Sequence, residues 1–372
     1  MTHGDIGHGD IGHGDIGHGD IGRNDHAPGG RVKLDRVCIV MLAAVGDAVH
    51  ALPVINAIKR AHPTARISWV MQAGALTNLL SGHPAVDEVI AFRRTDGVRG
   101  FAAVRRELHA RRFDCVLVLQ PYLKSGIVAS FADAPVKVGF DRARARDLSW
   151  LFSSQQLPAR PLQHMQDQYL EFAAWLGVEA QPLEWRIGPW NDAERSWQTA
   201  FVSQYERPLA PVVVATSKSQ KDWPAERWAV VCDALWHEFG LQPLLVGGRS
   251  PRELEAERVI NAGARVKPAS ALGNGGLRGL AAIIEKSALV LSPDTGPLHL
   301  SVALGTPVIS LLGYTNPKRV GPYRKFGDLM IDAYGEPGEA YPISMQNRPD
   351  RMGRITVQQV LDKVARWKSV YA

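Results

Sequence analysis

The residues with the clearest chemical potential lie in the segment SPDTGPLHLSVALGTPVISLLGYTNP (292–317). The apolar residues before it predict a buried strand, and residues 296–304 predict a helix directly after that strand. Thr295 and Gly296 would then lie at a helix N-terminus, where free backbone N–H groups and the helix dipole favour a phosphate group. A simple N-cap would explain Asp294 or Thr295 alone, but not the whole run. The segment therefore predicts an anion-binding site at the end of a strand.

Lys221 is a second candidate, in the segment ATSKSQKDWPAERWAVV (215–231). A predicted strand ends where this segment begins, and Pro224 stands where the next helix would start. An ammonium group in this loop could neutralise the charge on a departing diphosphate. A solvated loop lysine is the alternative interpretation, and the spacing alone leaves both open.

Glu253 is a third candidate, in the segment VGGRSPRE (246–253). Two glycines follow a predicted strand, and an acid lies in the next helix. This arrangement allows a carboxylate to hydrogen-bond ribose hydroxyls, as it does in dinucleotide sites. Glu255 is close enough in sequence to be an alternative, and the motif is weak when taken alone.

The matching feature of the first half is Asp47, in RVCIVMLAAVGDAVHALPVINAIKRAHPTARISWV (36–70). The first predicted strand ends near Leu42, and the amphipathic residues 54–61 predict a helix. Gly46 and Asp47 are expected in front of this helix. A carboxylate at the tip of a strand could take a proton from a hydroxyl group, although it could also only cap the helix.

These loops are expected to lie on two similar α/β units. Short apolar runs alternate with amphipathic stretches from Arg31 onward, which is the pattern of a parallel doubly wound sheet. The pattern breaks at the proline-containing residues 181–189, and a second series follows. We therefore predict two Rossmann-like domains, residues 31–188 and 189–372, that face each other across a cleft. The last helix, predicted over 357–368, is expected to pack on one of them, with a return to the N-terminal domain as one option.

The first 30 residues differ from the rest of the chain. The pentapeptide HGDIG occurs four times in tandem over residues 3–22, and its glycine content and single large apolar residue predict a disordered tail. The repeated histidines could bind a transition metal, but a repeat without function is the favoured interpretation. Five aspartates and one arginine give residues 1–30 a net charge of −4, so the remaining residues carry +10, against +6 for the whole chain. A basic body favours anionic partners.

The composition excludes several classes of protein. No apolar run reaches the about 18 residues that span a bilayer, and no secretory signal is recognised at the N-terminus, so a cytoplasmic protein is expected. Cys38, Cys115 and Cys232 lie singly in apolar runs, which is typical of buried thiols rather than of a disulfide framework or a zinc site. No basic run with interleaved aromatic residues appears, and nucleic acid is not expected as a partner.

The segment 292–317 resembles the signature of glycosyltransferase family 9, the ADP-heptose heptosyltransferases, and the likeness extends over about residues 36–368. The resemblance implies the GT-B fold, with the acceptor bound by the N-terminal domain and the donor by the C-terminal domain. It implies contacts with the donor from Thr216, Ser217, Lys221, Glu253, Asp294, Thr295, Gly296 and His299. It also implies that Asp47 is the general base. Residues 42–45 depart from the family pattern in the loop that would meet the acceptor.

The implied reaction is an inverting, metal-independent transfer of a sugar onto a hydroxyl of a glycan like the lipopolysaccharide core. The expected donor is ADP-heptose or another nucleoside-diphosphate sugar, and no cofactor is expected. The expected acceptor is an anionic glycan or glycolipid, reached through peripheral contact with the inner face of the cytoplasmic membrane. Two alternatives stay open: a nucleotide-sugar 2-epimerase on the same fold, and a nucleotide-sugar-binding module without catalytic activity.

Overall fold

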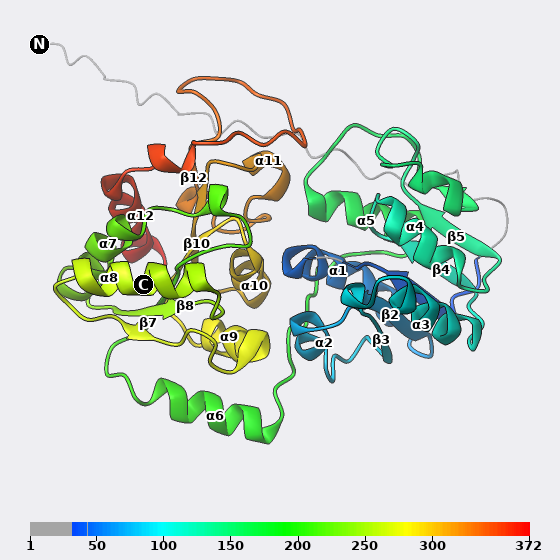
Figure 1. Cartoon of the computed structure of the whole chain (residues 1–372), viewed down its shortest axis with the longest axis horizontal. Helices are drawn as coiled ribbons and strands as arrows, with labels where there is room; N and C mark the ends of the chain where they lie inside the picture. The colour runs from blue at the N-terminus through cyan, green and yellow to red at the C-terminus, as the bar shows by residue number, and fades with distance from the viewer. Residues whose placement is uncertain (1–31, 43) are drawn as a thin grey trace, which may run out of the picture.

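The chain forms two lobes, each built on a parallel six-stranded sheet (Figure 1). The structure, a computed structural model, describes residues 32–42 and 44–372, so the predicted repeat tail lies outside the described residues. The strand orders are β3-β2-β1-β4-β5-β6 and β12-β11-β10-β7-β8-β9. Both sheets therefore have the doubly wound Rossmann order, in which the strand sequence reverses at the centre. This confirms the predicted fold class.

The first lobe contains the strands and helices up to α5. Its strands are β1 (Arg36–Val40), β2 (Arg66–Gln72), β3 (Glu88–Phe92), β4 (Cys115–Val118), β5 (Val136–Gly139) and β6 (Gln155–Gln156). Its helices are α1 (Val45–Ala61), α2 (Ala75–Leu79), α3 (Gly97–His109), α4 (Leu123–Ser130) and α5 (Met165–Trp175).

The second lobe repeats this arrangement. Its strands are β7 (Leu209–Val213), β8 (Gln242–Val246), β9 (Ala269–Ser270), β10 (Val290–Pro293), β11 (Val308–Leu312) and β12 (Ile331–Asp332). Its helices are α6 (Asp192–Val202), α7 (Ala225–His237), α8 (Pro251–Gly263), α9 (Gly276–Glu285), α10 (Gly296–Leu304), α11 (Pro317–Val320) and α12 (Val357–Val370).

The central strands are apolar on both faces because helices cover both sides of each sheet. In β1, Val37 and Ile39 belong to the core beneath α1 and α5, whereas Cys38 and Val40 belong to the core beneath α3 and α4. All three cysteines are free and buried, as their apolar surroundings predict. No helix within the described residues is both long and apolar enough to cross a membrane.

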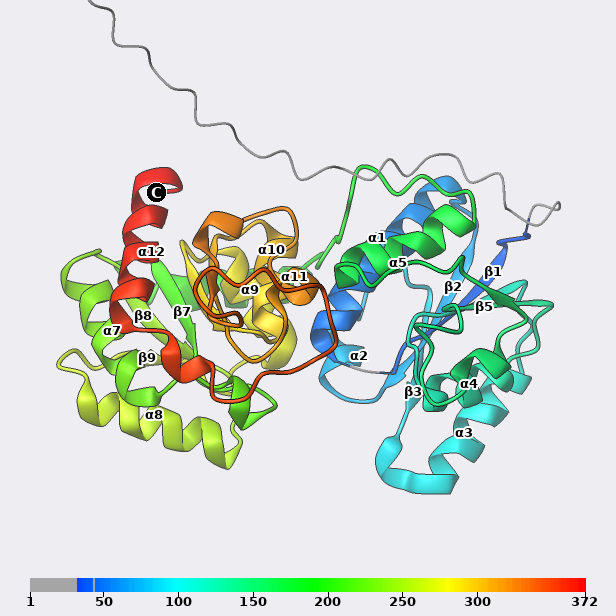
Figure 2. The same ribbon diagram turned by 90° about the horizontal axis from the view of Figure 1, so that it is seen from above.

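The last helix packs on the C-terminal lobe. Trp367 of α12 donates a hydrogen bond to the carbonyl of Ala288, and Val360 and Val364 are buried in the same core as residues of α7. Figure 2 shows α12 beside α7 and far from the N-terminal sheet. The suggested return to the N-terminal domain is therefore wrong, because the apolar face of the helix is already covered by α7 and the β11 side of the second sheet.

Helix α1 begins earlier than the sequence predicts. It starts at Val45 rather than after Asp47, so Pro53 lies in the interior of the helix. Gly46 and Asp47 therefore lie in the first turn of the helix and not in a loop in front of it. The apolar periodicity conceals this turn because four of the residues 43–48 are alanine or glycine, and continuous burial begins only at Ala48.

Candidate active site

The two lobes meet where α1 and α10 begin. Each of these helices follows a central strand of its sheet, β1 or β10, so both start at the point where strand order reverses. A Cβ placed on Gly46 would lie 2.6 Å from Cδ2 of His299, and one on Gly296 would lie 2.8 Å from Cγ1 of Val45. Glycine at both positions allows the two helix N-termini to touch across the lobes.

Asp294 is the anchor of a charged cluster beside this contact. The Lys221 ammonium lies 2.5 Å from Oδ2 of Asp294 and 3.3 Å from its backbone carbonyl, and His299 Nε2 lies 3.7 Å from Oδ1. Burial alone would raise the pKa of Asp294, but the neighbouring His299 and the positive charge of Lys221 outweigh it and hold the pKa well below its usual range. Asp294 is therefore an ionised anchor that orients two potential donors.

Asp47 faces the same region from the N-terminal lobe. Its carboxylate is partly buried, and burial raises its pKa against the opposing influence of Arg319, His299 and the Gln120 amide. Arg319 and His299 both belong to the C-terminal lobe. A carboxylate whose pKa is raised toward neutrality is suited to accept a proton, and its environment is completed only where the two lobes meet.

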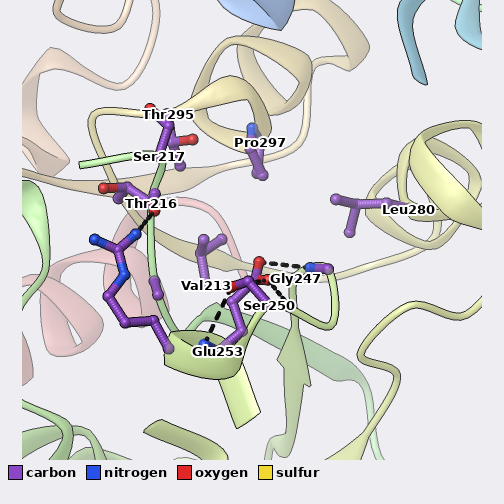
Figure 3. A pocket seen from close by; sticks show the side chains of 12 residues that line it. Val213, Thr216, Ser217, Gly247, Ser250, Glu253, Leu280, Thr295 and Pro297 are labelled. Carbon is purple, nitrogen blue, oxygen red and sulfur yellow. Dashed lines mark hydrogen bonds between the residues drawn. The ribbon is translucent and has the colours of Figure 1, made fainter. Parts of the chain in front are cut away.

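A pocket of about 440 Å³ lies in the C-terminal lobe beyond the carboxyl ends of β7, β8 and β10. Thr216, Ser217 and Thr295 lie together on one side of it, and Gly247 and Glu253 lie on the other (Figure 3). Helix α10 has no side-chain cap at Thr295, so the backbone N–H groups of its first turn at the pocket are not occupied by a capping side chain.

Glu253 already holds the loop that forms one wall of this pocket. Its carboxylate accepts hydrogen bonds from Gly248 N (2.6 Å), Ser250 N (2.8 Å) and Ser250 Oγ (2.7 Å), as part of a capping box at the start of α8. Burial would raise its pKa, but these hydrogen bonds lower it. Glu255, the sequence alternative, is instead exposed and paired with Arg258. The structure thus favours Glu253 over Glu255 as the residue at this pocket.

The predicted donor residues separate into two groups. The pocket of the C-terminal lobe is lined by Thr216, Ser217, Glu253 and Thr295. The contact between the lobes contains Gly296 and His299 together with Asp47, and the pair formed by Lys221 and Asp294 lies beside it. His299, expected to face the donor, is buried against Gly46 and packs edge-on against the His50 ring at 4.5 Å between ring centroids.

A second pocket, of about 480 Å³, opens on the other side of Asp47. Four arginines line it: Arg144, Arg146, Arg160 and Arg319. Arg144 is buried and neutralised by Asp141 and by Glu171, whose oxygens lie 2.6 Å and 2.8 Å from its guanidinium nitrogens. The other three form no salt bridge within residues 32–42 and 44–372, so this pocket offers free positive charge next to the candidate base.

Sequence reasoning missed Gln120 and Arg319, both of which line this second pocket with Asp47. Gln120 follows β4, the other central strand of the first sheet. A polar residue two positions after an apolar strand could have identified it as a candidate for the site. Arg319 lies in α11 of the opposite lobe, and no local pattern relates it to Asp47. Its contribution depends entirely on how the lobes meet.

Comparison with known proteins agrees with this geometry. The sequence profile described as glycosyltransferase family 9 (heptosyltransferase) matches residues 101–334, more than half of the chain. The lipopolysaccharide core heptosyltransferase OpsX of Haemophilus influenzae is 31% identical over 300 residues, which cover 81% of this chain and 85% of that protein. Lipopolysaccharide heptosyltransferase 1 of Escherichia coli K12 is 29% identical over 304 residues, covering 78% and 91%.

Solved structures show the same architecture. A glycosyl transferase family 9 protein from Veillonella parvula has a TM-score of 0.76 at 24% identity, covering 90% of this chain and 97% of that one. The E. coli heptosyltransferase WaaC with ADP has a TM-score of 0.70 at 25% identity, covering 89% and 99%. A UDP-GlcNAc 2-epimerase from Methanocaldococcus jannaschii has a TM-score of 0.51 at 13% identity, which shows a shared fold and does not support the epimerase alternative. The chain is a glycosyltransferase with the GT-B architecture, and it belongs to glycosyltransferase family 9, the heptosyltransferases.

Proposed function

We propose that the chain transfers heptose from ADP-heptose to a hydroxyl of a lipopolysaccharide-core glycan, with inversion at the anomeric carbon. Its relatives are named lipopolysaccharide heptosyltransferases, and WaaC has been solved with ADP and with ADP-2-deoxy-2-fluoro heptose. The observation that carries the proposal is the contact between the first turns of α1 and α10. This contact brings Asp47 to the start of the helix that opens onto the nucleotide pocket.

In this mechanism Asp47 takes the proton from the acceptor hydroxyl as the hydroxyl oxygen attacks the anomeric carbon. The bond from that carbon to the diphosphate breaks on the opposite face, which inverts the configuration without a covalent intermediate. The raised pKa of Asp47 suits this step, because a base is most effective when its pKa approaches the working pH. Asp294 is less suited to the same role, because the lowered pKa of its carboxyl makes it a weak base.

The leaving diphosphate is stabilised by the donor lobe. Backbone N–H groups at Thr295 and Gly296 would hold the phosphates at the uncapped start of α10, with the Thr216 and Ser217 loop on the same side of the pocket. Lys221, oriented by Asp294, would add positive charge. We propose that these protein groups make a metal ion unnecessary, so transfer should proceed unchanged in the presence of EDTA.

The acceptor would enter the arginine-lined pocket beside Asp47. Arg146, Arg160 and Arg319 form a basic wall there, which fits a glycan that carries carboxylate or phosphate groups. Gln120 and Tyr122 of the same pocket also line a neighbouring pocket of about 490 Å³. The acceptor site therefore extends along the carboxyl edge of the N-terminal sheet, where a glycan longer than one sugar can lie.

We further propose that this lobe works in the cytoplasm, in peripheral contact with the inner face of the membrane. Leu148 and Leu151 are 60% and 58% exposed, and Asp147, which directly precedes Leu148, lines the neighbouring pocket of about 490 Å³. Asp147 and Leu148 have positive φ angles of 51° and 60°, which is uncommon outside glycine. Exposed leucines among arginines are suited to an anionic lipid surface.

The membrane contact is tested by co-sedimentation with vesicles that contain phosphatidylglycerol. The double variant Leu148→Asp and Leu151→Asp should lose vesicle binding while transferring normally to a soluble core oligosaccharide. Val230→Asp is the matched control, because Val230 is 51% exposed on α7 of the other lobe. Equal vesicle binding by all three proteins would refute the contact.

The reaction itself is tested with Asp47→Asn, assayed with ADP-heptose and deacylated lipopolysaccharide core. Transfer should be lost while calorimetry shows unchanged ADP binding, because Asp47 lies outside the nucleotide pocket. Lys221→Ala should instead weaken ADP binding, and Asp362→Asn, at an exposed position of α12, should behave as the wild type. Turnover by Asp47→Asn would remove the base assignment, and a product with retained anomeric configuration would exclude inversion.

A further inference from the structure

Gln120 is a buried polar residue that the mechanism above does not use. Its side chain is 3% exposed and lies two residues beyond β4, at the centre of the N-terminal sheet. The oxygen Oε1 accepts hydrogen bonds from Leu42 N (2.8 Å) and from Ser125 Oγ (3.1 Å). Since the backbone N–H of Leu42 can only donate, the amide oxygen must be the atom that faces it. The orientation of the Gln120 amide is therefore determined by its partners.

This orientation leaves Nε2 as a free donor at the candidate base. No acceptor within the described part of the chain meets hydrogen-bond geometry with Nε2, although the atom is buried and the amide lies close enough to Asp47 to lower the pKa of that carboxyl. Gln120 and Asp47 line the same pocket. Buried donors without a partner are uncommon, because each one costs about 1–3 kcal/mol when it is left unsatisfied. An unpartnered donor beside a partly buried carboxylate thus requires an explanation beyond packing.

We propose that Gln120 is a positioning residue for the catalytic base: its Nε2 donates to Asp47 during the reaction and holds the carboxylate ionised and aimed at the acceptor hydroxyl. A donor on one carboxylate oxygen leaves the other oxygen free to receive the acceptor proton. The proposal rests on the assignment of Asp47 as the base.

Other charged or polar groups also surround Asp47, so the contribution of Gln120 has to be separated from theirs. They come from α5, α10, α11 and the end of β10, and they are Tyr169, His299, Arg319 and Asp294. Arg319, His299 and Gln120 all favour the ionised form of Asp47, whereas Asp294 opposes it. Of the three groups that favour the ionised form, Gln120 alone lies in the same lobe as Asp47.

The variant Gln120→Glu distinguishes positioning from a purely structural role. A glutamate keeps an oxygen for Leu42 N and Ser125 Oγ, so a residue that merely supports the start of α1 would tolerate it. If Gln120 serves the base, the variant puts a second negative charge beside Asp47 and raises its pKa. The acidic limb of kcat against pH should then move to higher pH, with kcat at pH 7 reduced about tenfold or more, and ADP binding should not change.

Two further variants complete the experiment. Gln120→Met removes the donor without adding charge, and it should move the acidic limb in the same direction by less, even if it lowers the melting temperature. The pH profile of Gln120→Met also tests the proposal if Gln120→Glu does not fold. Ser125→Ala loses one contact to Oε1 but keeps Nε2 in place, so its pH profile should match the wild type.

The outcomes separate the two proposals. If Asp47→Asn is inactive but Gln120→Glu has the pH profile of the wild type, the role of Gln120 is overturned and the assignment of Asp47 as the base stands. Gln120→Met replaces Gln120→Glu in this comparison if the latter does not fold. Activity in Asp47→Asn would overturn the base assignment itself.

Discussion

The contact between the two helix N-termini makes a sharp prediction for Gly46→Ala. The added Cβ would lie 2.6 Å from Cδ2 and 3.0 Å from Nε2 of His299, whereas carbon atoms pack at about 3.5–4.0 Å. His299 cannot easily withdraw, because it is buried between Asp294 and the His50 ring. The first turn of α1, which carries Asp47, must therefore move by about 1 Å relative to α10.

A displacement of about 1 Å between reacting groups costs about 100-fold in rate. We therefore expect Gly46→Ala to lower kcat about 100-fold. The loss of stability should stay below about 2.5 kcal/mol, because an alanine in a helix gains about 0.5–1 kcal/mol over glycine and overpacking costs about 1–3 kcal/mol. ADP affinity should be unchanged, because the pocket proposed to bind the nucleotide lies in the other lobe.

The assay is steady-state transfer with saturating donor, combined with ADP calorimetry and urea unfolding. Gly353→Ala is the matched control: nothing lies within 4 Å of a Cβ at Gly353, and its φ is not positive. Wild-type kcat in Gly46→Ala would refute the argument that the contact between α1 and α10 positions the base. A large loss of stability would show that the contact supports the fold rather than the reaction.

Three further predictions concern stability and the donor pocket. Burial lowers the pKa of His164 to about 4 and that of His50 well below its usual value, so the unfolded chain binds protons that the folded chain does not. The urea midpoint should therefore decrease as the pH is lowered from about 6.5 to about 4, and it should decrease less steeply in His164→Gln. A midpoint that does not change over this pH range would contradict the prediction. Arg144→Met should cost about 3–5 kcal/mol in urea unfolding, because Asp141 and Glu171 would stay buried without their cation, whereas exposed Arg142→Met should cost little. Glu253→Gln should weaken ADP binding in calorimetry by loosening the Gly248–Ser250 turn, and equal binding to that of Glu255→Gln would count against the turn as part of the site.

Several elements follow from local sequence pattern alone. The short apolar runs 88–92 and 136–139 each predict a strand, and residues 296–304 predict a helix; these match the observed β3, β5 and α10. Each is a short apolar run or a helix between clear turn residues, so its boundaries depend on neighbouring residues only.

Other elements escaped prediction for physical reasons. The strands β6, β9 and β12 have two residues each, which is too short for a detectable alternation. Helix α6 was also missed, although Asn191 and Glu194 form a capping box at its start. That signal was present in the sequence, three residues apart, directly after the predicted linker.

The site divides in a similar way. The sequence placed Asp47, Lys221 and Asp294 at the ends of central strands, because motif and strand order are local or repeated features. It did not show that Lys221 and Asp294 pair with each other at 2.5 Å, because the two residues are 73 positions apart in the sequence. It also did not show that His299, for which the family resemblance implies a donor contact, lies against Gly46 of the opposite lobe.

The sequence by itself therefore determined the two doubly wound domains and the loops that carry chemistry, since apolar periodicity, glycine and proline act over a few residues. Only the tertiary structure decided how those loops combine. The approach of α1 to α10, the free amide of Gln120 and the position of Arg319 near Asp47 all depend on packing between segments distant in sequence. Burial and the charges of a partner lobe set the pKa of Asp47, and no local pattern encodes either of them.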